Sequence, residues 1–172
     1  MIKNTVVIAV WLILISLTRS LVAQSSWRFE DYEVSVYTGP IHHPKWIRHI
    51  NGDEWRDSLG KLVGPPEVNF AGKYFVAVHS CGTGCRYYTM NDLSSGRALN
   101  LLKDFDAAEP PPKTRDGYPY LTDLITRPNS KLLVAQYHVE LRNGPECRER
   151  AFVFDGEKIT PVNNTKRTCT QY

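Results

Sequence analysis

The chain has 172 residues, four cysteines and a formal net charge of +3, from 21 Lys and Arg against 18 Asp and Glu. Acidic and basic residues are interspersed and do not form the clustered basic face of nucleic-acid-binding proteins, so no nucleic-acid partner is predicted. The length is that of one ordinary domain with room for a real hydrophobic core.

The first 23 residues are typical of a secretory signal peptide. Lys3 supplies the positive start, residues 6–17 form an apolar run, and Ala23 suits cleavage before Gln24. This run is shorter than the roughly 20 residues that span a bilayer, so we expect export without stable membrane insertion. An uncleaved membrane anchor is the alternative. Cleavage would leave a single β-rich domain, residues 24–172, with 19 basic and 18 acidic residues.

Before residue 70 the sequence predicts one strand and one helix. Residues 32–36 alternate apolar and polar side chains, as a half-buried strand does. Asp53 has the character of an N-cap and precedes four apolar residues at helical spacing: Trp55, Leu59, Leu62 and Val63. We therefore expect one short amphipathic helix over about 53–63, ended by Gly64 and the two prolines that follow it.

From residue 70 onward the chain is typical of antiparallel β-structure. A first meander is predicted over 70–102, with turns at 81–85 and 94–96. A loop over 103–117 follows, and the three consecutive prolines 110–112 favour an extended conformation there.

A second meander is predicted over 118–162. Residues 133–141 alternate strongly between apolar and polar side chains, and Asp155-Gly156 is a favoured hairpin turn. The polar tail 163–172 is expected to fray unless Cys169 is bonded. The predicted fold class is mainly β, with antiparallel meanders arranged like propeller blades or as a sandwich, and one short N-terminal helix.

All four cysteines follow the predicted signal peptide, and an even number in an exported chain indicates disulfides. Three pairings are possible, of which we favour the neighbours, Cys81 with Cys85 and Cys147 with Cys169. The chain-entropy model assigns about 2 kcal/mol to the shorter loop and about 3.4 kcal/mol to the longer one. Zinc binding by these cysteines is the alternative, but no second ligand pair at a suitable spacing completes such a site.

No catalytic, cofactor or metal site is predicted. The sequence Cys81-Gly82-Thr83-Gly84-Cys85 differs from a thioredoxin motif because three residues separate the cysteines and no helix follows them. It also lacks the lysine and the helix of a phosphate-binding loop. No nucleophile elbow is present. A hydrolase that uses His79 or His138 as its base is the alternative.

Four residues are predicted to bind a partner. They lie at the cysteine-flanked turn or at the edge of the following loop, where their side chains are suited to recognition: Thr83, Arg86, Tyr118 and Tyr120.

The chain resembles a group of uncharacterised exported bacterial proteins. The resemblance is carried by the segment Asn69-Phe70-Ala71-Gly72-Lys73-Tyr74, an NFAG(H/K)Y motif, and by the CGTGC turn, and it covers about residues 53–162. Lys73 and His79 depart from that group's pattern. The resemblance implies a bacterial envelope protein and implies no activity.

Together these observations predict an exported binding protein of the periplasm or extracellular space that does not catalyse. Its expected partner is another protein of the cell envelope, and its expected role is that of an inhibitor or immunity factor for a cell-wall hydrolase. A structural envelope module without a ligand is a further alternative.

Overall fold

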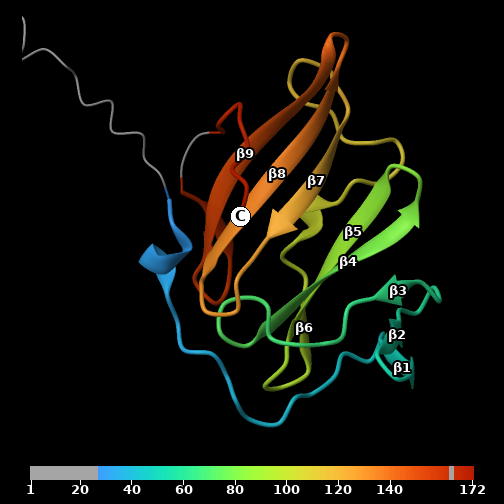
Figure 1. Cartoon of the computed structure of the whole chain (residues 1–172), viewed down its shortest axis with the longest axis vertical. Helices are drawn as coiled ribbons and strands as arrows, with labels where there is room; N and C mark the ends of the chain where they lie inside the picture. The colour runs from blue at the N-terminus through green and yellow to red at the C-terminus, as the bar shows by residue number, and fades with distance from the viewer. Residues whose placement is uncertain (1–26, 163–164) are drawn as a thin grey trace, which may run out of the picture.

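The computed structural model describes residues 27–162 and 165–172, so the predicted signal peptide lies outside the described residues. The strands form three antiparallel sheets, ordered β1-β2-β3, β4-β5-β6 and β10-β9-β8-β7 (Figure 1). The mainly β, antiparallel fold class predicted from the sequence is confirmed.

The described chain contains ten strands and two short 3-10 helices. In order they are the 3-10 helix η1 (Phe29–Tyr32), β1 (Arg48–Asn51), β2 (Glu54–Arg56), β3 (Leu62–Val63), β4 (Tyr74–Gly82), β5 (Cys85–Asp92), β6 (Arg97–Leu99), the 3-10 helix η2 (Lys103–Phe105), β7 (Tyr120–Ile125), β8 (Leu132–Leu141), β9 (Gly144–Phe154) and β10 (Ile159–Pro161).

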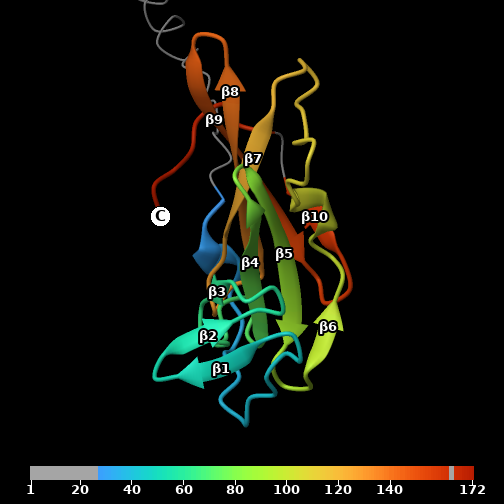
Figure 2. The ribbon, with the colours of Figure 1, turned by 90° about the vertical axis from the view of Figure 1, so that its right-hand side faces the viewer.

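The two larger sheets pack together around a shared core. Figure 2 shows β4, β5 and β6 side by side, in front of the sheet that contains β7. The core is made of buried apolar side chains from both sheets, chiefly Tyr74, Tyr88 and Met90 from the first and Leu133, Phe152 and Phe154 from the second. This packing of two antiparallel sheets over one apolar core is sandwich-like.

The β8–β9 hairpin is the longest paired unit, and its register runs from Leu132 opposite Val153 to Leu141 opposite Gly144. On the face away from the shared core, Val134 is also fully buried. It is covered because η1 lies on that face and contributes Phe29 to a second apolar cluster. This end of β8 is therefore buried on both sides.

The helix predicted over about 53–63 is wrong. Residues 54–56 and 62–63 are strands β2 and β3, which pair antiparallel across a tight turn. Asp57 stabilises the turn because its Oδ1 accepts hydrogen bonds from the amides of Leu59 and Lys61, both at 2.9 Å. Leu59 and Leu62 are 59% and 68% exposed, so the apolar spacing that resembled a helical stripe is not a buried face.

The strand predicted over 32–36 is also absent from the described structure. Glu33 makes one isolated bridge with Ser130, and Val34 donates to the carbonyl of Asn129 at 2.9 Å. The segment is bonded to turns and not to another strand, so its alternating pattern does not extend into a ladder.

The C-terminal tail is fixed to β9 by a disulfide between Cys147 and Cys169. Lys166 forms two backbone hydrogen bonds with Glu149, and the Trp27 indole donates to the Tyr172 hydroxyl at 3.1 Å. The tail is thus held as expected for a bonded Cys169.

Thr122 on β7 offers a test of core packing. Its side chain is fully buried, and its hydroxyl has no hydrogen-bond partner among the described residues. Because valine has the same shape without the hydroxyl, Thr122→Val is expected to raise the free energy of unfolding by about 1 kcal/mol in urea denaturation. Thr89→Val is the matched control and should be destabilising, because the Thr89 hydroxyl bonds to His79 at 2.9 Å. Equal losses in both variants would contradict the prediction.

Candidate functional site

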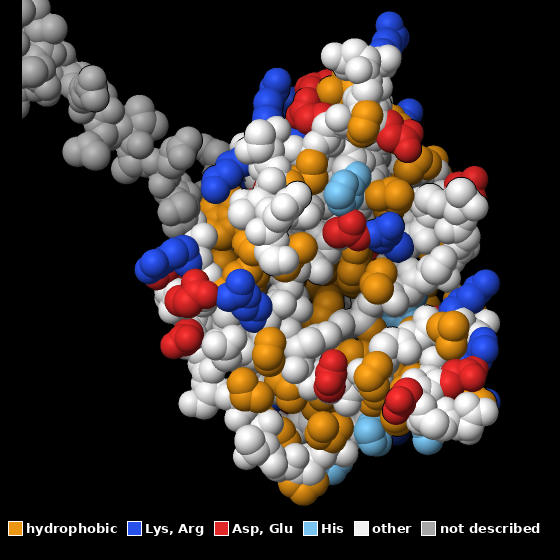
Figure 3. Space-filling model, viewed as in Figure 1, with side chains coloured by type: hydrophobic (Ala, Val, Ile, Leu, Met, Phe, Trp, Pro, Cys, Tyr) orange, Lys and Arg blue, Asp and Glu red, His pale blue; other side chains and the backbone are white. Residues whose placement is uncertain are grey.

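One candidate site is a groove of about 410 Å³ where the edges of β4 and β7 approach each other. Figure 3 shows a hollow on this face, bordered by hydrophobic side chains and by a group of basic, acidic and histidine side chains. The groove combines apolar lining residues from three strands with polar ones: Leu62, Val78, Leu121 and Leu124, and Ser80, Arg86 and Asp123.

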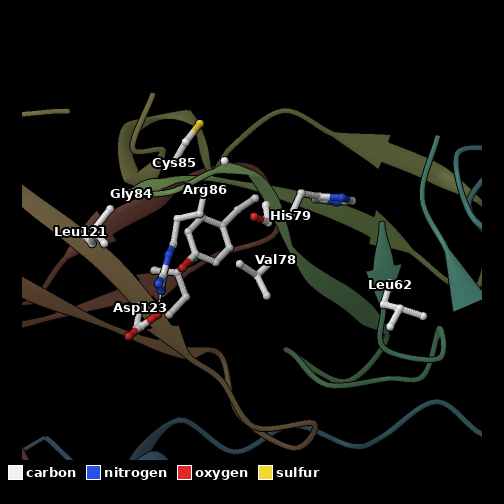
Figure 4. A pocket seen from close by; sticks show the side chains of 12 residues that line it. Leu62, Val78, His79, Gly84, Cys85, Arg86, Leu121 and Asp123 are labelled. Carbon is white, nitrogen blue, oxygen red and sulfur yellow. Dashed lines mark hydrogen bonds and ion pairs between the residues drawn. The ribbon is translucent and has the colours of Figure 1, made fainter. Parts of the chain in front are cut away.

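Strand alternation decides which side chains of β4 and β5 face this groove. Val78 is paired with Tyr88, and Ser80 with Arg86, so these four residues share one face of the sheet. His79 lies on the opposite face, and Figure 4 shows its ring pointing away from Arg86 and Asp123.

Three bonded polar side chains lie along the β7 side of the groove. The Arg86 guanidinium donates to the Asp123 carboxylate, whose other oxygen lies 2.8 Å from Nε2 of His138. These side chains are 30%, 43% and 48% exposed. They are open to solvent and to a ligand, and such exposed pairs add little to stability.

Tyr88 joins the two sheets at the base of the groove. Its hydroxyl donates to the Thr122 carbonyl at 2.6 Å, and burial raises the pKa of the phenol, with Arg86 opposing that shift. The phenol therefore stays protonated and continues to donate. The backbone amide of Tyr88 donates to Asp106 Oδ1 at 2.9 Å, so Asp106 fixes the 103–117 loop to β5.

The CGTGC turn closes one end of the groove. Cys81 and Cys85 form a disulfide, which confirms the pairing favoured from the sequence. Gly84 has a φ of +71°, a conformation that favours glycine, and Thr83 is exposed at the tip. The turn thus presents Thr83 on a covalently closed loop.

A second cavity, of about 230 Å³, lies on the other side of this turn. Thr83 and Tyr120 line it, together with Pro111 and Pro119 and the carboxylates of Glu109 and Glu140. Gly84, Cys85 and Leu121 line both cavities. The disulfide-closed turn therefore separates two neighbouring hollows.

The structure brings three of the four predicted binding residues to these cavities. Arg86 lines the first, and Thr83 and Tyr120 line the second. Tyr118 lines neither, because its backbone forms a turn with Thr114 through bonds of 2.8 and 3.1 Å. Sequence reasoning missed Asp123, whose signal is a lone acid within the apolar segment 120–125.

His79 is buried below the groove and not available to a substrate. It is 2% exposed, its Nδ1 lies 2.9 Å from Asp57 Oδ2, and its Nε2 lies 2.9 Å from the Thr89 hydroxyl. The ring stacks on Tyr87 with centroids 4.5 Å apart. The order carboxylate, imidazole, hydroxyl is that of a hydrolytic triad. His79 belongs to the groove lining, but its ring points away from Arg86 and Asp123 and is almost fully buried. His138 bonds to Asp123 and is not brought to His79.

Within residues 27–162 and 165–172 there is no group of three or more His, Cys, Asp or Glu side chains placed to hold a metal ion. Over the same residues, no helix is long and apolar enough to cross a membrane. The two disulfides are typical of proteins in an oxidising environment outside the cytoplasm.

Comparisons of the chain with protein-family models, with curated proteins and with solved structures find no match. The resemblance to exported bacterial proteins stays a prediction, and function has to be argued from the site itself.

Proposed function

We propose that the chain is an exported binding protein of the bacterial envelope that recognises another envelope protein, as an inhibitor or immunity factor of a cell-wall hydrolase does. One observation carries the proposal: a disulfide-closed turn stands between two open cavities that mix apolar walls with charged groups. Protein-binding sites combine a rigid scaffold with apolar pockets and a polar rim in this way.

The chemistry of the groove supports binding over hydrolysis. Arg86 and His138 are each bonded to Asp123, and no serine or cysteine nucleophile is bonded to the imidazole of His138 among the described residues. The cysteines beside the groove are oxidised and cannot act as nucleophiles.

Photocrosslinking in intact cells tests the proposal. A photoreactive residue at position 83 or 120, beside the turn, is expected to crosslink one envelope protein. The same residue at position 160, exposed on β10 at the opposite edge of the sheet, is the matched control and should not. Equal crosslinking from all three positions, or from none, would contradict the proposal.

The double variant Cys81→Ser with Cys85→Ser adds a second arm. Opening a loop this short is expected to lower the free energy of unfolding by about 2 kcal/mol. The folded variant should lose the crosslink because the turn is no longer held rigid. A folded variant that crosslinks as the wild type does would show that the disulfide has no part in recognition.

A further inference from the structure

The outer edge of β4 is closed along its first half and open along its second. Asn69 covers Val76: its Oδ1 accepts from the Val76 amide and its Nδ2 donates to the Val76 carbonyl, both at 2.8 Å. Tyr74 is covered in the same way by the backbone of Phe70, at 2.9 and 3.0 Å. Covering of this kind prevents an edge strand from pairing with other chains.

Val78 and Ser80 point their backbone groups to this same outer side. In an antiparallel ladder the backbone groups of every second residue face the same neighbour, so those of Val78 and Ser80 follow those of Val76. The residues paired with them on β5 support this orientation. Tyr88 donates its amide to Asp106 and Arg86 donates its amide to Ala107, both away from β4. No described residue bonds to the outer-edge amides and carbonyls of Val78 and Ser80.

This open edge borders the groove. Val78 is 52% exposed, and Val78, Ser80 and Leu62 all line the groove. The edge of β7 on the other side is not open in the same way, because the Thr122 carbonyl accepts from Tyr88 and the Tyr120 amide donates to Pro112 at 3.1 Å. Only the β4 side of the groove therefore offers consecutive free donors and acceptors among the described residues.

We infer that the groove binds an extended segment of a partner protein, which adds to the β4-β5-β6 sheet as a strand along Val78 and Ser80. Donors and acceptors repeated every two residues match the backbone of another extended chain. Alternate side chains of that segment would cover Val78 and Leu62 and fill the groove, with Arg86 and Asp123 at its polar rim. This inference rests on the proposed function and specifies how the partner is held.

The open stretch is too short for pairing with a second copy of this chain. It covers residues 78–80, about 10 Å of strand, because the register of β4 on β5 shifts between Ser80 and Gly82. A second copy would bring the covered half of its own β4 and its own CGTGC turn to either side of the contact. Pairing limited to this stretch falls far short of the roughly 1,200 Å² that a stable dimer buries. A single extended segment meets neither obstacle.

Selection from a displayed library of linear peptides of about ten residues, against the oxidised mature protein, tests the inference. Selected peptides should alternate apolar residues and should slow hydrogen exchange at the amides of Val78 and Ser80. They should bind Ser80→Ala with the wild-type Kd, because that variant keeps the amide. Ser80→Pro removes an outer-edge donor that β5 does not use, and should weaken binding about tenfold or more.

Val78→Lys is a second blocking variant and keeps the test falsifiable if Ser80→Pro does not fold. Val78 is half exposed, so the fold should tolerate lysine, while a charge on the edge opposes strand addition. Failure to select peptides, wild-type affinity in both blocking variants, or exchange protection away from β4 would each overturn the inference.

The inference and the proposed function fail separately. If positions 83 and 120 crosslink a partner in cells and neither Ser80→Pro nor Val78→Lys reduces that crosslink, the partner binds without strand addition. If neither position crosslinks but peptides bind along β4, the edge accepts strands and the proposed envelope partner is wrong.

Discussion

Asp57→Ala is expected to lower the free energy of unfolding by about 3 kcal/mol, because it removes a buried carboxylate that accepts hydrogen bonds from the β2–β3 turn and contacts His79. Asp57 is 3% exposed and holds His79, which is equally inaccessible, through a contact of 2.9 Å. It also fixes the β2–β3 turn, so its loss should loosen the β1-β2-β3 sheet. Urea denaturation followed by tryptophan fluorescence measures this, since Trp46 lies 4.7 Å from the His79 ring.

Asp53→Ala is the matched control for this experiment. Asp53 lies four residues earlier and is exposed, so its replacement should change stability by less than about 0.5 kcal/mol. Equal effects of the two variants would mean that the Asp57–His79 contact does not support the fold.

The same carboxylate should contribute to acid unfolding. Burial opposes its ionisation, but hydrogen bonds from His79 and from the amides of Lys61 and Leu59 outweigh burial and hold the pKa of Asp57 below its usual 3.8. Its stabilising contribution is therefore present above pH 3.8 and is lost as the pH falls below that value. Asp57→Asn should remove this part of the pH dependence, as measured by denaturation at a series of acid pH values.

Glu149→Ala is expected to cost about 3 kcal/mol and to release the C-terminal tail from β9. Glu149 is fully buried, and its Oε2 accepts from Gln136 Nε2 and from the Thr170 amide, both at 2.9 Å. Its Oε1 accepts from the Thr170 hydroxyl at 3.1 Å. Removal of the carboxylate leaves the Thr170 amide and hydroxyl without this acceptor, while Gln136 keeps its bond to the Thr170 carbonyl. Urea denaturation gives the loss of stability, and limited trypsin digestion should cut faster after Lys166 and Arg167.

Glu157→Ala is the control here, because Glu157 is exposed in the β9–β10 turn and should not affect the tail. The disulfide to Cys169 stays intact in both variants, so faster cleavage reports local release and not chain separation. Unchanged cleavage in Glu149→Ala would mean that the disulfide and the backbone bonds of Lys166 hold the tail without the carboxylate.

The longest pairs of strands could be predicted from the sequence because the patterns that specify them extend over only a few residues. In β8 the residues from Ala135 to Leu141 alternate between apolar and polar side chains, and a period of two predicts a half-buried strand. The turns at Gly96 and Gly156 have positive φ, which glycine adopts readily. Side-chain alternation and turn residues together were sufficient to predict where the two meanders lie.

The segment 53–63 could not be assigned correctly because its conformation is set by partners distant in the sequence. Trp55, Leu59 and Leu62 fit a helical period, yet only Trp55 packs against the core. Asp57 turns the chain and reaches His79, 22 residues away. A local pattern cannot reveal that an apparent N-terminal helix is a hairpin held by the buried contact between Asp57 and His79.

Some of the candidate binding residues could be predicted from the sequence and others could not. Thr83 was predictable because two nearby cysteines and two glycines specify a closed turn with Thr83 at its tip. Asp123 and the open edge of β4 were not, because they depend on which strands become neighbours: Arg86 meets Asp123 across 37 residues.

The sequence by itself determined a mainly β fold, the positions of its two meanders and a disulfide-closed turn, since alternation, turn residues and cysteine spacing act over short distances. Only the tertiary structure decided that this turn stands between two cavities, that His79 is enclosed, and that the β4 edge is covered at Val76 and open at Val78. Each of these depends on contacts between residues far apart in the chain, which burial and strand order select and which no local pattern encodes.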